Sequence, residues 1–174
     1  MPNPIKLLYL GLLLGVFGFS HAQEKPNAHL DTAYGSNEKV GKHISINRAQ
    51  LYYEEYGKGE PLLLIHGNNG SIKSMGNQID YFKDNYRVIV ADNRGHGKSE
   101  LNTDSLTCVQ ITKDWEELVN YLGLDSIHIL GWSDGGIIGL KMGISGRCNL
   151  QKIIAKSMST IICRSFCRLL HRIS

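Results

Sequence analysis

Cysteine is scarce in this sequence and unevenly spread. Of the four cysteines, only Cys108 lies in the body of the chain, whereas Cys148, Cys163 and Cys167 lie near its end. This spacing fits neither a disulfide framework nor a metal site with recognisable ligand spacing. A large excess of charge is also missing, since the formal net charge is only +3. The sequence therefore gives no reason to expect a metal ion or a nucleic-acid partner.

The sequence also lacks an apolar run long enough for a typical membrane-spanning helix. Its run Leu7–Phe19 has 13 residues, whereas a spanning helix needs roughly 20. The run follows Lys6 and precedes Ser20-His21-Ala22, which is typical of the cleavage site of a secretory signal peptide. We therefore predict a cleaved signal peptide over 1–22 and a secreted or periplasmic protein, with an uncleaved membrane anchor as the alternative. The polar stretch 23–41 is expected to be a linker or a loose N-terminal arm.

Apolar runs and amphipathic segments alternate over residues 42–155, which is typical of one α/β domain. The first two runs partly alternate and predict antiparallel strands, whereas continuous apolar runs later in the chain predict strands buried on both faces. The predicted strands are Lys42–Ile46, Gln50–Tyr56, Leu62–Ile65, Tyr86–Ala91, Ser126–Leu130 and Gln151–Ala155, and the predicted helices are Ile72–Phe82, Thr107–Leu122 and Gly135–Met142.

The segment Gly131-Trp132-Ser133-Asp134-Gly135 lies where a predicted strand turns into a predicted helix. A serine at the centre of so sharp a turn has its hydroxyl pushed out of the backbone path. The flanking glycines are needed because side chains there would clash. The N–H groups at the start of the helix point at whatever Ser133 attacks. This pattern predicts a nucleophile elbow, and an ordinary glycine turn is the alternative.

Three motifs stand in order along the chain, each at the end of a predicted strand: His66–Gly70, Asp92–Ser99 and Gly131–Gly136. As a set they resemble the α/β-hydrolase superfamily, in the broad group of serine esterases, lipases and related acyl hydrolases. The resemblance covers roughly residues 42–154. It implies a doubly wound, mostly parallel α/β sheet with antiparallel N-terminal strands, here incomplete. The elbow is similar to that of valacyclovir-hydrolase-like esterases.

The resemblance also implies roles for individual residues. Ser133 corresponds to the nucleophile, and the backbone N–H groups of Asn68 and Asp134 correspond to the oxyanion hole. An aspartate at the centre of the elbow would indicate the dehalogenase or epoxide-hydrolase branches, so a serine there argues against both. The resemblance implies no metal ion and no cofactor, and the expected substrate is a small ester or amide.

Two histidines near these motifs are not expected to act as the catalytic base. His66 resembles the structural histidine of the oxyanion loop. His96 lies between glycines in a polar loop, and such histidines mostly hold loops together through hydrogen bonds.

Acidic residues are absent from the sequence after Asp134, and its only later histidine is His171. In the α/β-hydrolase superfamily the triad acid and base both follow the nucleophile. His171 lies in a segment that resembles nothing in that superfamily. We therefore identify neither the acid nor the base, and we expect a truncated chain that is inactive or nearly so.

The last segment, 156–174, is aberrant and basic. From Ser145 to Ser174 the sequence has six lysines and arginines and no acid. We interpret this change as a frameshift near Ala155, because it coincides with the loss of every further family element. The alternative is an amphipathic helix, with Arg164, Arg168 and Arg172 on its cationic face, that binds a membrane surface or a partner.

Together these observations predict a truncated form of an exported serine hydrolase that acts on carboxylic esters through an acyl-enzyme on Ser133. Two alternatives stay open. The first is an amidase or peptidase of the same superfamily. The second is a non-catalytic half-domain that binds a membrane or a partner through its basic tail.

Overall fold

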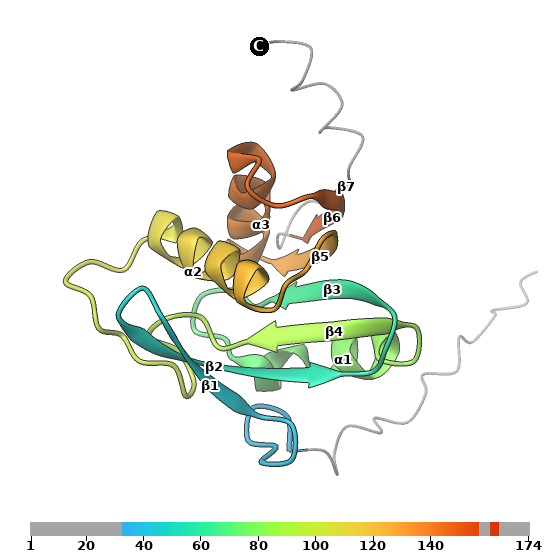
Figure 1. Cartoon of the computed structure of the whole chain (residues 1–174), viewed down its shortest axis with the longest axis horizontal. Coiled ribbons are helices and arrows are strands. Elements are labelled where there is room, and N and C mark those ends of the chain that lie inside the picture. Colours follow the sequence, from blue (N-terminus) through green and yellow to red (C-terminus); the bar gives the residue numbers. More distant parts are fainter. Residues whose placement is uncertain (1–32, 157–160, 164–174) are drawn as a thin grey trace, which may run out of the picture.

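The computed structural model describes residues 33–156 and 161–163. The predicted signal peptide, the first part of the predicted linker and most of the predicted basic tail, including Arg164, Arg168, His171 and Arg172, lie outside the described residues. Within the described residues, seven strands form one sheet in the order β1-β2-β4-β3-β5-β6-β7 (Figure 1).

The boundaries of the predicted elements agree with the structure to within a few residues, and one further strand, Ile161–Cys163, lies in the segment that was expected to be an aberrant tail. The strands are β1 (Lys42–Ile46), β2 (Ala49–Tyr56), β3 (Glu60–Ile65), β4 (Tyr86–Ala91), β5 (Ile127–Trp132), β6 (Leu150–Lys156) and β7 (Ile161–Cys163). The helices are η3 (Ile72–Met75), α1 (Gly76–Phe82), α2 (Cys108–Tyr121) and α3 (Asp134–Ser145). The helix predicted over Ile72–Phe82 is thus split in two, a 3₁₀ turn followed by an α-helix that begins at Gly76.

The strand directions confirm the predicted fold class. The pairs β1–β2 and β2–β4 are antiparallel, whereas β3 pairs in parallel with both β4 and β5, and β5 pairs in parallel with β6. Each parallel connection crosses over through a helix. Figure 1 shows α2 and α3 on one side of the sheet and α1 on the other, as expected for a doubly wound sheet.

The two faces of the sheet explain why the central strands are continuously apolar. On β3, Leu63 and Ile65 pack with α2 and α3, while Leu62 and Leu64 pack with η3 and α1. Because successive side chains of a strand point to opposite faces, a strand covered on both sides needs apolar residues at every position.

None of the helices among the described residues has the length and apolar character to cross a bilayer.

The end of the predicted linker, 33–41, packs on the domain. Tyr34 is only 4% exposed. The buried Glu54 carboxylate of β2 accepts hydrogen bonds from the Gly35 and Asn37 backbone N–H groups, both at 3.0 Å. It also accepts from the hydroxyls of Tyr52 and Tyr56, both at 2.7 Å. This acid therefore fixes the segment to the sheet, although the segment itself is polar.

Candidate active site

The predicted nucleophile elbow is a sharp turn in the structure. Ser133 lies between β5 and α3 with φ of 53° and ψ of −118°, a backbone conformation that costs a residue other than glycine free energy. Hydrogen bonds hold it there: the Ser133 N–H donates to the Lys156 carbonyl at 2.7 Å, and the Gly136 N–H donates to the Ser133 carbonyl at 2.8 Å. The strand-to-helix turn predicted from the glycine spacing is confirmed.

The glycines around Ser133 are required by close backbone contacts. A Cβ atom on Gly131 would lie 2.3 Å from the Gly135 carbonyl oxygen, and one on Gly135 would lie 2.1 Å from the Ile65 carbonyl oxygen. A Cβ atom on Gly67 would lie 3.0 Å from the Cβ of Ser133. The loop that follows β3 therefore lies directly against the elbow.

That loop presents the backbone N–H of Asn68 from a fixed peptide unit. The carbonyl of this unit, Gly67 O, bonds to His66 Nδ1 at 2.8 Å and accepts from the Gly70 N–H at 3.1 Å. The described residues contain no cis peptide bond, and in a trans peptide the carbonyl and the N–H point in opposite directions. The two bonds on Gly67 O thus set the direction of the Asn68 N–H.

Neither of the two predicted oxyanion-hole donors, the backbone N–H groups of Asn68 and Asp134, has a hydrogen-bond acceptor within the described part of the chain. Asp134 is the first residue of α3, where backbone N–H groups have no partner within the helix. The contact of Gly67 with Ser133 brings these three sequence-predicted residues into one site.

His66 holds the loop after β3 to the loop after β4 and has no ring nitrogen left for catalysis. Its Nε2 accepts from the Asn93 N–H at 2.9 Å, so in the neutral ring the proton is on Nδ1, which donates to Gly67 O. The Asn93 side-chain amide also donates to the His66 carbonyl at 3.1 Å. Burial lowers the pKa of His66. The structure supports the structural role predicted for this histidine.

The lowered pKa of His66 predicts a loss of stability in weak acid. The unfolded chain binds a proton at this histidine near pH 6.5, whereas the folded protein does so only at lower pH. The stabilisation is therefore complete above about pH 6.5 and is lost as the pH falls toward the folded pKa, at up to about 1.4 kcal/mol per pH unit. Urea unfolding at pH 8.0, 6.5 and 5.5 measures this loss.

A matched pair of variants assigns the acid sensitivity to the correct ring. His66→Gln removes the buried imidazole and is expected to flatten the pH dependence of the unfolding free energy between pH 6.5 and 5.5. His43→Gln removes an exposed imidazole and should leave that dependence as in the parent. An equal slope in the parent and in His66→Gln would show that another group binds the proton.

The loop that follows β4 is fixed by the buried Asp92. One carboxylate oxygen accepts from the Ile72 N–H at 2.8 Å and the other from the Lys98 N–H at 2.8 Å. The aspartate thus joins the first turn of η3 to the loop. In the same loop His96 Nδ1 lies 3.0 Å from the Arg94 carbonyl oxygen, as expected for a histidine that holds its own loop together.

A buried ion pair between Arg94 and Asp114 was not predicted from the sequence. Arg94 Nε donates to Asp114 Oδ2 at 2.7 Å and Nη2 donates to Oδ1 at 2.8 Å, and both side chains are 1% exposed. These hydrogen bonds to Asp114 raise the pKa of Arg94. The guanidinium also donates to four backbone carbonyls, those of Ile46, Asn47, Leu101 and Asn102.

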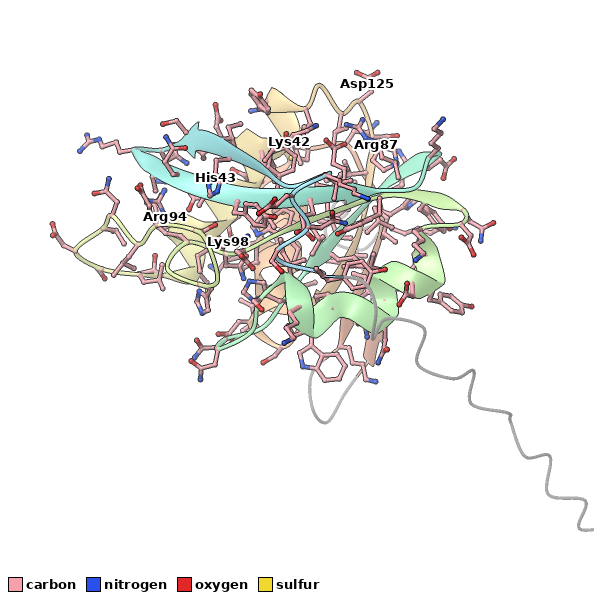
Figure 2. All side chains as sticks on the ribbon, turned by 90° about the horizontal axis from the view of Figure 1, so that it is seen from below. Lys42, His43, Arg87, Arg94, Lys98 and Asp125 are labelled. Atoms are coloured by element: carbon pink, nitrogen blue, oxygen red, sulfur yellow. The ribbon has the colours of Figure 1, made fainter. Side chains whose placement is uncertain are left out.

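This pair ties the loop after β4 to its neighbours. Figure 2 shows Arg94 and Lys98 in that loop, next to the β1–β2 hairpin. Asp114 is supplied by α2, so the one guanidinium links the hairpin, the loop and the helix. In the sequence, only the helical pattern of α2 pointed to this ion pair, because Asp114 stands next to Trp115, which is buried.

No group of three or more histidine, cysteine, aspartate or glutamate side chains gathers as metal ligands within the described part of the chain. Cys108 and Cys148 are both free thiols.

Comparison with known proteins identifies the family. The family model described as the alpha/beta hydrolase fold matches residues 60–147, from β3 to just beyond α3. The chain belongs to the α/β-hydrolase family. This match includes the loop after β3, the loop after β4 and the elbow, which are the three motifs on which the resemblance rested.

Individual hydrolases are also similar to this chain. The chain is similar to an (E)-2-((N-methylformamido)methylene)succinate hydrolase of Acinetobacter baylyi, with 39% identity over 64% of this chain and 42% of that protein. It is similar to the serine hydrolase BPHL of Homo sapiens, with 31% identity over 66% of this chain and 41% of that protein.

Among solved structures, the chain resembles an epoxide hydrolase, CorEH, with a TM-score of 0.64 and 28% identity over 67% of this chain and 41% of that one. The chain thus spans about two fifths of the length of each of these three relatives.

Proposed function

We propose that this chain carries the nucleophile and the oxyanion hole of an exported serine hydrolase that cleaves small carboxylic esters. The observation that carries the proposal is the contact of Gly67 with Ser133. Asn68 directly follows Gly67, so its N–H belongs to the loop that lies against the serine, while the following residue, Asp134 of α3, supplies a second N–H. The names of two relatives, a hydrolase of a succinate derivative and a serine hydrolase, support hydrolysis of a small molecule.

The nature of the central residue distinguishes between reactions within the family. Ser133 stands at the centre of the elbow, where we expect an aspartate in epoxide hydrolases, although CorEH is among the structural neighbours. A serine hydroxyl forms an ester with the acyl group of its substrate, so acyl transfer fits this residue better than epoxide opening.

In the proposed reaction Ser133 Oγ attacks the ester carbonyl carbon. The carbonyl oxygen becomes an oxyanion that accepts hydrogen bonds from the Asn68 and Asp134 N–H groups, and one such donor is worth about 3 kcal/mol of the barrier. Collapse of the intermediate expels the alcohol and leaves the acyl-enzyme, which water then hydrolyses. The proton of the Ser133 hydroxyl has to pass to a base before the alcohol leaves.

The base that would accept this proton is not His66. His66 has both ring nitrogens bonded, and no acid follows Asp134 in the sequence. We therefore propose that the nucleophile of this chain is assembled but weakly activated. The export proposal is supported by the sequence of residues 1–22.

Labelling with a fluorophosphonate probe tests the nucleophile and the missing base together. We expect slow labelling of the full chain that disappears in Ser133→Ala and that speeds up when imidazole is added as an external base. Unchanged labelling in Ser133→Ala would contradict the nucleophile. Fast labelling without imidazole would instead contradict the missing base, and His96→Gln would then show whether His96 supplies it.

A further inference from the structure

We propose that His96 is a positioning residue for the oxyanion loop, and that a proton on its Nε2 adds a hydrogen bond to the side chain of Asn68. This inference rests on the proposed function of the Asn68 N–H as an oxyanion donor. It assigns to the loop after β4 a role beyond holding its own conformation.

The tautomer of His96 follows from its partner on the other side of the ring. Nδ1 lies 3.0 Å from the carbonyl oxygen of Arg94, and a carbonyl oxygen can only accept, so Nδ1 carries a proton. In the neutral ring Nε2 is consequently an acceptor. It becomes a donor only when the ring takes up a second proton.

The orientation of the Asn68 side chain is equally determined by its surroundings. Its Oδ1 accepts from the Asn69 N–H at 3.0 Å, a bond that the amide NH₂ group could not make. The same Oδ1 lies 3.5 Å from His96 Nε2. With a neutral His96 two acceptors thus face each other, and a separation of 3.5 Å suits such a pair. A proton on Nε2 turns this contact into a charge-assisted hydrogen bond that should be markedly shorter.

This bond would act on the oxyanion hole in two ways. First, it would fix Asn68 from the loop after β4, in a turn where Asn69 has a left-handed φ of 56° and the Gly70 N–H closes back on Gly67 O. Second, it would bring an imidazolium charge close to the residue whose N–H receives the oxyanion. Positive charge in a preorganised site stabilises an oxyanion.

The charged groups around His96 have partners of their own. The titratable ring that contacts it is His66, at a centroid distance of 5.3 Å, and burial keeps that ring neutral to lower pH. The ionic side chains of its own loop are engaged elsewhere: Asp92 with the Ile72 and Lys98 N–H groups, Arg94 with Asp114, and Lys98 Nζ 4.7 Å above the Tyr52 ring.

Nuclear magnetic resonance titration of the full chain tests the link without any chemistry at Ser133. We expect the Asn68 backbone amide to shift with the same midpoint as the His96 ring. We also expect Asn68→Ala to lower that midpoint by about half a pH unit, a roughly threefold weaker proton affinity, because an acceptor for the imidazolium is lost. Asn77→Ala, at an exposed position of α1, is the control and should change nothing. If the titration midpoint of His96 is the same in Asn68→Ala as in the parent, the proposal is overturned.

Two variants of His96 test its effect on the site. Glutamine places a neutral donor near the position of Nε2, whereas asparagine places one near Nδ1 only. At pH 5.5 we expect the parent to label with fluorophosphonate several times faster than His96→Asn. At pH 8 we expect these two proteins to label equally fast. We expect His96→Gln to label faster than His96→Asn at both pH values. A ratio of parent to His96→Asn that is independent of pH would contradict the role of the proton. If Ser133 labels in no variant, the proposed function fails, while the coupling of His96 to Asn68 is still decided by the titration.

Discussion

Gly135→Ala is expected to destabilise the protein by more than about 4 kcal/mol, a large part of the roughly 5–15 kcal/mol that stabilises a typical folded domain. The new Cβ would lie 2.1 Å from the Ile65 carbonyl oxygen, 2.7 Å from the Ile65 carbonyl carbon and 2.8 Å from the His66 carbonyl oxygen. All three atoms belong to the backbone at the end of β3, a strand that pairs on both sides. Because the backbone in the middle of a sheet cannot move without breaking hydrogen bonds between strands, the clash cannot be relieved without a large loss of stability.

The matched control for this prediction is Gly146→Ala. Gly146 ends α3 with a left-handed φ of 67°, and nothing lies within 4 Å of an added Cβ. Only the conformational cost of about 1 kcal/mol applies there. Urea unfolding monitored by tryptophan fluorescence compares the two variants. Similar losses of unfolding free energy in both variants would mean that α3 can move away from β3. The close contact at the elbow would then not explain why residue 135 is a glycine.

The second large effect is expected from Arg94→Met, at about 3–5 kcal/mol of unfolding free energy. This variant leaves the Asp114 carboxylate buried without its cation and removes the donors of four backbone carbonyls. Arg87→Met is the control, since Arg87 pairs with Glu55 at 2.6 Å through a side chain that is 35% exposed. Exposed pairs typically contribute less than about 1 kcal/mol.

A double variant separates the ion pair from the carbonyl bonds. In Arg94→Met/Asp114→Leu no charge is buried, so a pure ion-pair effect would be largely reversed. We expect only partial recovery, because the carbonyls of Ile46, Asn47 and the 101–102 segment still lack their donor. The side-chain amides of Asn47 and Gln110 also lose the Asp114 carboxylate as their acceptor. Full recovery would show that these carbonyls find water instead. An Arg94→Met loss no larger than that of Arg87→Met would contradict the importance of the buried pair.

Local sequence patterns were sufficient for the elements and for the elbow. Leu62–Ile65 is apolar at every position because both faces of β3 are covered, and this leaves a continuous run in the sequence. The turn at Ser133 is equally local, since its glycines at 131 and 135 contact each other across the turn. The sequence patterns that predict these features span only a few residues, so they could be recognised without knowing how the strands pair, although Gly135 is also constrained by Ile65 and Ser133 by Lys156.

Features that depend on distant partners could not be predicted in the same way. Glu54 and Arg94 are charged residues that would normally be placed on the surface, and partners that include residues 35–37 and Asp114 explain why they are buried. The direction of the Asn68 N–H depends on a histidine tautomer that is set by Asn93, 27 residues after His66. Family resemblance, rather than any pattern in the residues, led to the choice of Asn68.

The strained conformation of Ser133 has a consequence for the order of assembly. Its N–H is held by the carbonyl of Lys156, which follows it by 156 − 133 = 23 residues and belongs to β6. On a ribosome the serine and the first turn of α3 emerge well before the strand that restrains them. A nascent chain would therefore acquire its reactive geometry only after β6 has docked in parallel beside β5, and until then the serine could relax like any residue of an unfinished loop.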